Sequence, residues 1–167
     1  YPYMLQAISD YEARAHGLRY DPEEIILTIG ATEGLFIGLS TILNPGDEVI
    51  IPTPAFGLYE SIVVANHAKA VFLDTEPAQF QIDEEALRAC VTPATKAIVI
   101  CSPNNPTGCI YTEETLNAVH EVLKDQPIFV FCDDVYRELV YTDGYHSFAE
   151  FQDMRDRIIV IQSFSKP

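Results

Sequence analysis

The sequence predicts an α/β fold in which a mostly parallel sheet lies between two layers of helices. Two observations predict it. Six short runs rich in β-branched and other apolar residues alternate along the chain with segments whose apolar residues recur at helical spacing. The runs are apolar almost throughout, as expected for strands that are buried on both faces of a sheet.

The first part of the chain predicts a helix, a strand and a second helix. Residues 3–16 have amphipathic spacing, and Gly17 marks the expected end of this helix. Residues 24–30, EIILTIG, are β-branched and are predicted as the first strand. Residues 31–43 have helical spacing, and residues 44–47, NPGD, have the composition of a turn.

The same alternation continues through the middle of the chain. Residues 48–52, EVIIP, predict a second strand, and residues 55–67 predict the helix that follows it. Residues 69–73 predict a third strand. A helix over residues 84–90 comes next, with Asp83 placed to cap its N-terminus.

The last part of the chain predicts three further strands. They cover residues 96–101 (KAIVIC), 128–132 (IFVFC) and 157–162 (RIIVIQ). A helix over residues 113–124 separates the first two of them. A short helix near residues 134–140 and a polar loop separate the last two.

The composition narrows the classes of partner. The chain has 167 residues, of which 48% are hydrophobic and 21% charged, as in a globular domain. Its 10 Lys and Arg against 25 Asp and Glu give a formal net charge of −15, which disfavours nucleic acid and anionic membranes as partners. The four cysteines form no CxxC pair and the four histidines are scattered, so we expect free thiols and no metal site. The first residues resemble no targeting segment, and a cytoplasmic protein is expected.

Residues that carry chemistry cluster where the predicted strands end, and in a parallel sheet these ends meet at one edge. Residues 30–34, GATEG, open a helix whose free N–H groups suit an anion such as phosphate. Residues 102–108, SPNNPTG, present an amide from a loop stiffened by proline. Asp133 follows a buried run, with Tyr136 about one helical turn further on. Lys166 lies among hydroxyls after the last run.

Each of these segments also has a purely structural interpretation. Residues 30–34 can be a tight strand-to-helix turn, residues 102–108 a rigid connector, and Asp133 a helix cap. Lys166 can be a surface charge, or a nucleophile with a lowered pKa. Taken together, the phosphate donors, amide, carboxylate, phenol and lysine suit a phosphorylated pyridine aldehyde that forms a Schiff base with the lysine.

Five motifs show which family this chain resembles. GATEG, PGDEVIIPTPAFGLY, SPNNPTG, CDDVY and SFSK follow one another in the order and at the spacing of the class I/II aminotransferases, which are fold-type I pyridoxal-phosphate enzymes. The resemblance extends over essentially the whole chain. It implies pyridoxal 5′-phosphate as cofactor, and transfer of an amino group between an amino acid and a 2-oxo acid through a lysine Schiff base.

The resemblance also implies a role for each matching residue. Lys166 would form the Schiff base and move a proton between the substrate α-carbon and the cofactor. Asp133 would pair with the pyridinium nitrogen and keep it protonated, which makes the ring a better electron sink. Asn105 and Tyr136 would both hydrogen-bond the phenolic oxygen of the cofactor.

The phosphate and the ring have their own expected partners. Ala31 and Thr32 would give backbone N–H groups to the phosphate, and Ser163 would add its hydroxyl. Phe56 would stack on the pyridine ring, a role that needs only a flat apolar face. Tyr59 is expected to pack instead. The other polar residues of these segments are expected to be structural, capping or solvated: Glu33, Asn104, Asp134, Glu138 and Ser165.

Compared with this family, the chain is expected to hold part of a protein. Residues 1–167 would be the large, cofactor-binding domain, incomplete at both ends and without the small C-terminal domain. In the family, an antiparallel strand that follows the lysine inserts between the strands predicted at residues 24–30 and 157–162. Residues 1–167 alone are therefore expected to be neither stable nor active. The family also implies a homodimer.

Two alternatives to an aminotransferase stay open. The shared motifs prepare the cofactor without deciding the reaction, so a pyridoxal-phosphate-dependent lyase or synthase on the same fold fits them equally. An inactive remnant that still binds the cofactor fits a shortened chain. A dehydrogenase or nucleotide switch is disfavoured, because the glycine fingerprints GxGxxG and GxxxxGKS/T are absent.

Overall fold

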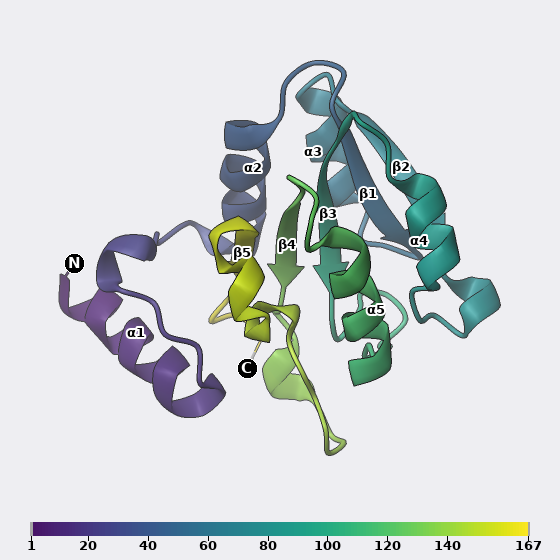
Figure 1. Cartoon of the computed structure of the whole chain (residues 1–167). Coiled ribbons are helices and arrows are strands. Elements are labelled where there is room, and N and C mark those ends of the chain that lie inside the picture. Colours follow the sequence, from purple (N-terminus) through teal and green to yellow (C-terminus); the bar gives the residue numbers. More distant parts are fainter. Residues whose placement is uncertain (1, 167) are drawn as a thin grey trace.

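The computed structural model describes residues 2–166 and contains a five-stranded, wholly parallel sheet (Figure 1). The strands lie side by side in the order β2-β1-β3-β4-β5. Their bounds are β1 (Glu48–Thr53), β2 (Lys69–Asp74), β3 (Thr95–Cys101), β4 (Phe129–Asp133) and β5 (Ile158–Ile161). These confirm the last five predicted strands, each to within one residue at either end.

Helices cover both faces of this sheet, which confirms the three-layer α/β/α architecture. The helices are α1 (Pro2–His16), α2 (Gly30–Ile42), α3 (Leu58–Ala65), α4 (Glu84–Cys90) and α5 (Glu113–Leu123). In Figure 1, α2 and α3 lie on one face of the sheet and α4 and α5 on the other, while α1 stands to the side. None of the helices within residues 2–166 is long and apolar enough to span a membrane.

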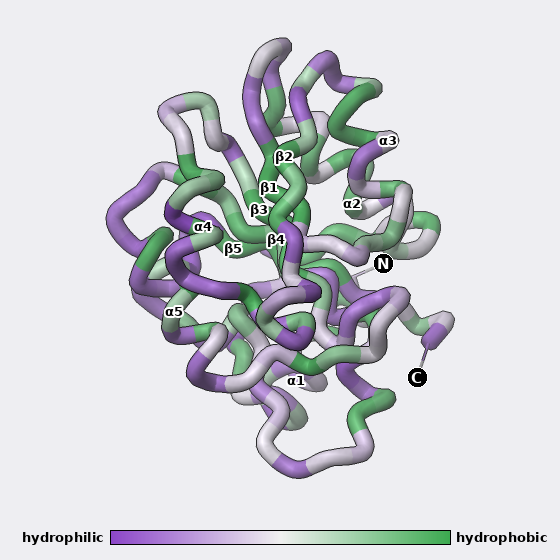
Figure 2. Tube along the Cα trace, turned by 90° about the vertical axis from the view of Figure 1, so that its right-hand side faces the viewer, coloured by the Kyte–Doolittle hydropathy of each residue, from purple (hydrophilic) through white to green (hydrophobic). Residues whose placement is uncertain are grey.

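Two apolar cores, one on each face of the sheet, hold the layers together. On β4, the fully buried Phe131 belongs to the core beneath α2 and α3, whereas its neighbours Val130 and Cys132 belong to the core beneath α4 and α5. A Cβ added at Gly38 would lie 2.6 Å from Phe131 Cε1, so this glycine allows α2 to approach β4. Figure 2 shows the hydrophobic strands gathered at the centre of the molecule.

The carboxyl ends of three strands are in register and define the edge where a site is expected. Cys101 at the end of β3 pairs with Asp133 at the end of β4, and Asp133 pairs with Ile161 at the end of β5. The loops that follow these three residues therefore leave the sheet side by side. Figure 1 shows the arrows of β3 and β4 pointing to this edge.

The prediction of a strand at residues 24–30 is wrong. Pro22–Glu24 form a 3-10 helix, and the residues after it lie outside the sheet, with Ile26 and Ile29 76% and 88% exposed. A strand is stable only where a neighbour pairs with its backbone N–H and C=O groups. Within residues 2–166 no strand pairs with this segment, so its β-branched composition alone does not make it a strand.

The helix predicted near residues 134–140 is only a three-residue 3-10 helix, Arg137–Leu139. The Asp134 N–H donates to the Ile161 carbonyl at 3.0 Å, so the backbone continues to pair with β5 beyond the end of β4. The chain can turn only after that contact. The sequence did not predict the two 3-10 helices that lead to β5, Phe148–Glu150 and Gln152–Arg157.

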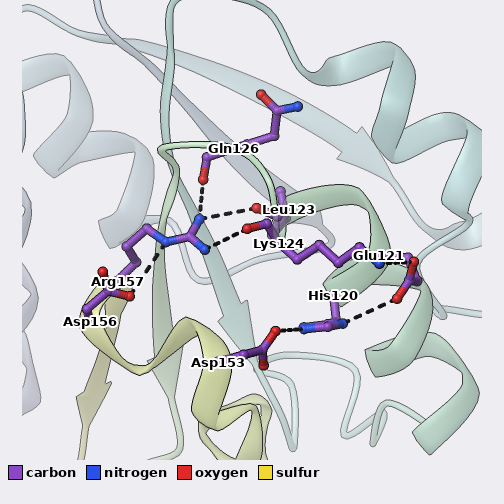
Figure 3. A network of polar contacts seen from close by, with 8 residues as sticks. All are labelled: His120, Glu121, Leu123, Lys124, Gln126, Asp153, Asp156 and Arg157. Atoms are coloured by element: carbon purple, nitrogen blue, oxygen red, sulfur yellow. Dashed lines mark hydrogen bonds and ion pairs between the residues drawn. The ribbon is translucent and has the colours of Figure 1, made fainter.

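Arg157 holds the start of β5 against the end of α5 (Figure 3). Its guanidinium donates to the carbonyl oxygens of Leu123 at 3.2 Å, Lys124 at 2.8 Å and Gln126. The last carbonyl groups of a helix have no partner within it, and a cation there is stabilising. A second contact, His120 Nε2 to Asp153 Oδ2 at 2.7 Å, joins α5 to the segment before β5. These contacts fix the amino end of β5, and the opposite, carboxyl end lies at the edge where the site is expected.

Candidate active site

Asp133 lies at the centre of the candidate site, at the carboxyl end of β4. Its side chain shares the α2/α3 face with Phe131, because alternate residues of a strand point to the same side. The residue is 5% exposed. Its Oδ2 accepts a hydrogen bond from the Tyr59 hydroxyl at 2.5 Å, whereas Oδ1 is buried and has no partner among residues 2–166. A buried acceptor without a donor is unfavourable, so a donor placed at Oδ1 would be stabilising.

Tyr59 does more than pack, which corrects the prediction from the sequence. It lies on α3, is 2% exposed, and directs its hydroxyl to Asp133. Phe56, one helical turn earlier, meets the Tyr59 ring edge-to-face, with centroids 5.9 Å apart and an angle of 90°. Phe56 is 42% exposed, so its ring is available at the same corner of the sheet. The three-residue spacing of the two aromatics is the sequence signal that could have linked Tyr59 to the site.

Asn105 and Tyr136 are brought together from two different loops. Within the loop after β3, Asn104 Oδ1 accepts from the Thr107 N–H at 3.2 Å and from its hydroxyl at 2.9 Å, so Asn104 is structural as predicted. Asn105 Nδ2 lies 3.4 Å from the Tyr136 hydroxyl. This separation exceeds the usual value of about 2.9 Å, and both groups keep most of their capacity to bind a third group.

The first turn of α2 offers backbone N–H groups at the same edge. Gly30 has φ +74°, a left-handed conformation that glycine tolerates, and α2 begins there. The N–H groups of Ala31 and Thr32 belong to the first turn, where a helix supplies no acceptors of its own. Ala31 is half-buried and Thr32 exposed. The Glu33 carboxylate accepts from the Ile29 N–H, which is the capping role expected of it.

The end of β5 lies against this turn of α2. A Cβ added at Gly34 would lie 3.5 Å from Ile161 Cδ1, so the helix N-terminus packs on the last residue of the strand. Ser163 follows two residues later; its hydroxyl lies 2.7 Å from that of Ser165 and accepts from the Ser165 N–H at 3.1 Å. Lys166 comes next and is exposed.

Burial dominates the electrostatics of the site. It raises the pKa of Asp133, and the hydrogen bond from the Tyr59 hydroxyl lowers that pKa in part. A positive partner at Oδ1 would lower it further and keep the carboxylate ionised. Burial and the charge of Asp133 raise the pKa of the neighbouring Cys101 thiol to about 12. The thiol beside the carboxylate therefore stays neutral at physiological pH.

Asp134 is neither solvated nor a helix cap, contrary to the prediction. It is 2% exposed, and its Oδ2 accepts from the Ser147 hydroxyl at 2.6 Å. Burial raises its pKa to about 7, although the charge of Arg137 lowers it in part. Asp133 and Asp134 thus enter different surroundings, because successive side chains at a strand end point to opposite faces.

The edge of the sheet gathers most of the predicted site residues. Asn105, Asp133 and Tyr136 lie at the ends of β3 and β4, with Phe56 beside them across Tyr59. A second group lies at the end of β5 and the start of α2: Ala31, Thr32, Ser163 and Lys166. Across residues 2–166, no group of three or more His, Cys, Asp or Glu side chains is arranged to hold a metal ion.

Comparison with known proteins identifies the family. The sequence model described as aminotransferase class I and II matches residues 1–167, the whole chain. The chain belongs to this family.

Individual class I and II aminotransferases match over nearly the whole chain. The aspartate aminotransferases of Geobacillus stearothermophilus and Musicola paradisiaca are 37% and 38% identical to it, each over 99% of this chain. The solved structure of the Rhizobium meliloti aspartate aminotransferase matches with a TM-score of 0.94 at 32% identity, also over 99% of this chain. The chain spans 43% and 42% of the length of the two relatives and 42% of that structure.

The site fits pyridoxal 5′-phosphate, the cofactor on which aminotransferases of this family depend. The unpaired, buried Oδ1 of Asp133 offers an acceptor for a ring N–H. The amide of Asn105 and the phenol of Tyr136 offer two donors for one oxygen. The N–H groups that open α2 suit a phosphate.

Proposed function

We propose that this chain carries the cofactor site of a pyridoxal-phosphate-dependent aminotransferase, which moves an amino group between an amino acid and a 2-oxo acid. The observation that carries the proposal is the buried Asp133 carboxylate, whose Oδ1 has no hydrogen-bond partner among residues 2–166, beside the converging Asn105 and Tyr136 side chains. Membership of the aminotransferase family supports it.

When bound, pyridoxal 5′-phosphate supplies an aldehyde that condenses with amines and a ring that accepts the electron pair of the substrate α-carbon. In the proposed arrangement, Asp133 Oδ1 holds a proton on the ring nitrogen, and Tyr59 holds Asp133. Asn105 and Tyr136 donate to the phenolic oxygen. The exposed Phe56 ring would cover one face of the cofactor ring and exclude water from it.

The phosphate and the reacting carbon are assigned to the second group of residues. The Ala31 and Thr32 N–H groups and the Ser163 hydroxyl bind the phosphate, where the helix N-terminus favours negative charge. Lys166 would hold the cofactor, because its Nζ amine can condense with the aldehyde with loss of water. Once the substrate amine displaced it, the free Nζ would be able to carry the proton of the substrate α-carbon.

A spectrum and a chemical trap test the cofactor site in the purified native protein. With pyridoxal 5′-phosphate, the wild type is expected to show a pH-sensitive visible band, and borohydride is expected to fix the cofactor on Lys166. The variant Lys166→Ala should lose both. Lys124→Ala is the matched control. Lys124 lies outside the site and forms an exposed ion pair with Glu121, with 2.6 Å between Nζ and Oε2. A label on another lysine, or an unchanged band in Lys166→Ala, would contradict the proposal.

A product assay separates transfer from the lyase and synthase alternatives. A transaminase converts the amino donor into its 2-oxo acid and forms one new amino acid from the acceptor for each donor consumed. A lyase releases fragments of the donor and forms no aminated acceptor. Equal amounts of the two expected products would therefore support transfer, and loss of donor without an aminated acceptor would favour a lyase.

A second copy of the chain is the proposed partner, and the cytoplasm the proposed location. Ile26, Ile29 and Phe36, in and just before α2, are 76%, 88% and 50% exposed, and exposed apolar residues of this kind mark interaction surfaces. The four cysteines are free thiols, which fits a reducing compartment. Sedimentation equilibrium of the native protein tests the dimer, and a monomer at all concentrations would exclude it.

A further inference from the structure

A charged side chain anchors α1 to the rest of the molecule. Among the described residues of this helix, Glu12 is the one that is buried, at 6% exposure. A helix that packs on a core normally buries an apolar stripe. A carboxylate is seldom buried unless it is paired, so the docking of α1 depends on the partner that Glu12 finds.

That partner is Arg137, which lies 125 residues away in the sequence. Its side chain is 2% exposed, and Nη2 donates to Glu12 Oε1. The next residue, Glu138, accepts from the Tyr11 hydroxyl at 2.8 Å and lies 2.9 Å from His16 Nε2. Three side chains of α1 thus meet two consecutive residues. These five residues, Tyr11, Glu12, His16, Arg137 and Glu138, are called the α1 latch below.

The α1 latch is joined to the candidate site through the backbone. The Arg137 N–H donates to the Asp134 carbonyl at 3.0 Å, and the Leu139 N–H donates to the Tyr136 carbonyl at 2.8 Å. Tyr136 lies inside this hydrogen-bonded turn, and its hydroxyl is the group that lies 3.4 Å from Asn105 Nδ2. A shift of Arg137 therefore moves the backbone that carries the Tyr136 phenol.

The physics of buried ion pairs indicates what the pair contributes. Such a pair adds little net stability over an apolar pair of similar volume, because both charges lose their hydration. Arg137 makes one side-chain hydrogen bond, from Nη2 to Glu12 Oε1, while Nε and Nη1 have no hydrogen-bond partner among residues 2–166. A guanidinium is planar and directional, so this one bond between two buried side chains fixes an orientation that apolar packing leaves loose. The specific contribution of Arg137 is thus geometric.

We propose that Arg137 is a positioning residue: held by Glu12 of α1, it fixes the turn that presents the Tyr136 phenol to the cofactor. This inference rests on the function proposed for the site. It gives α1, which is distant from Asp133 in the sequence, a part in shaping the site.

The test compares three variants of the purified native protein. Glu12→Leu combined with Arg137→Met replaces the ion pair by an apolar pair, and Arg137→Lys keeps the charge without the planar fork. Arg155→Met is the matched control, because Arg155 also ties the N-terminal segment to the body, through Glu24 at 2.9 and 2.7 Å, but on the surface. Two quantities are measured: hydrogen exchange of the amides at positions 137 and 139 without cofactor, and the midpoint of the pH titration of the cofactor band.

In the double variant and in Arg137→Lys, both amides are expected to exchange at least about tenfold faster, as expected when a hydrogen bond that holds the turn is lost. The titration midpoint is expected to move by at least about half a pH unit, because a displaced phenol changes the charge that it stabilises. Arg155→Met should leave both quantities at their wild-type values.

Several outcomes would overturn the inference. Wild-type exchange and midpoint in both variants of the pair would show that Arg137 positions nothing. Faster exchange with an unchanged midpoint would show that the turn is not what places the phenol, and equal effects in Arg155→Met would show general loosening. If the wild type binds no cofactor, the proposed function fails, and the exchange rates alone test the role of Arg137. Wild-type rates in the variants would then overturn that role. Faster rates would support Arg137 as the residue that holds the turn.

Discussion

Replacing Tyr59 with phenylalanine removes one hydroxyl from the candidate site and keeps the buried ring. The lost contact is the 2.5 Å hydrogen bond to Asp133 Oδ2, between residues that are 2% and 5% exposed. A hydrogen bond to a charged group contributes about 1.5–3 kcal/mol. Because this hydrogen bond favours the ionised carboxylate, its loss is expected to raise the pKa of Asp133 further.

The sign of the effect on stability follows from the direction of this shift. Burial already raises the pKa of Asp133 in the folded protein above its ordinary value. Between these two pKa values the folded state binds more protons than the unfolded state, so the free energy of unfolding falls as the pH rises. Tyr59→Phe extends this window upward. Its cost should be small at acid pH and reach about 1.5–3 kcal/mol once Asp133 is ionised in both proteins.

Urea unfolding of the native protein without cofactor, repeated over a series of pH values, measures this cost. Tyr111→Phe is the matched control, because Tyr111 is also 2% exposed and its hydroxyl has no carboxylate partner in the part of the chain that the structure describes. The control should lose the same amount of stability at every pH. A Tyr59→Phe curve parallel to that of the control would refute the proposed coupling between Tyr59 and Asp133.

Three further predictions concern stability. Gly38→Ala should lower the free energy of unfolding in urea by about 1–3 kcal/mol, because the new Cβ would lie 2.6 Å from Phe131 Cε1. Gly34→Ala is the control and should be tolerated, because the atom nearest to its Cβ lies 3.4 Å away. Equal costs for the two variants would contradict this prediction. Arg157→Met should cost about 1–3 kcal/mol and speed hydrogen exchange in the last turn of α5, and unchanged exchange would show that its carbonyls find other donors. Asp134→Asn should remove the fall in stability between the ordinary pKa of an aspartate and the value of about 7 to which burial raises it. If the free energy of unfolding of Asp134→Asn falls with pH as steeply as that of the wild type, Asp134 is not the group responsible.

The local sequence pattern predicted the strands that are apolar enough to be buried whichever strand pairs with them. The apolar runs VIIP, AIVIC and FVFC make up most of β1, β3 and β4, and such runs are typical of buried parallel strands. Residues 24–30 have the same composition but form no strand. The tendency to form a strand reflects packing and pairing against a neighbour, which the composition of one segment does not reveal.

The position of the site followed from topology, and its finer contacts did not. Once the strands were predicted to be parallel, Asn105 and Asp133 had to leave the sheet at one edge. The contact of Tyr59 with Asp133 depends on the face of β4 on which each side chain lies. The burial of Asp134 depends likewise on the opposite face, where Ser147 meets it.

By itself, the sequence determined the alternation of helices and strands, the family of the chain and the set of residues at the strand ends, because these depend on local periodicity and on short motifs. Only the tertiary structure decided that Tyr59 binds Oδ2 of Asp133 while Oδ1 has no partner among residues 2–166, and that Glu12 of α1 pairs with Arg137. Tyr59 and Asp133 lie 74 residues apart in the sequence, and Glu12 and Arg137 lie 125 residues apart. Their pairing is set by strand register and helix packing, which bring distant residues within a few ångströms and which no local pattern encodes.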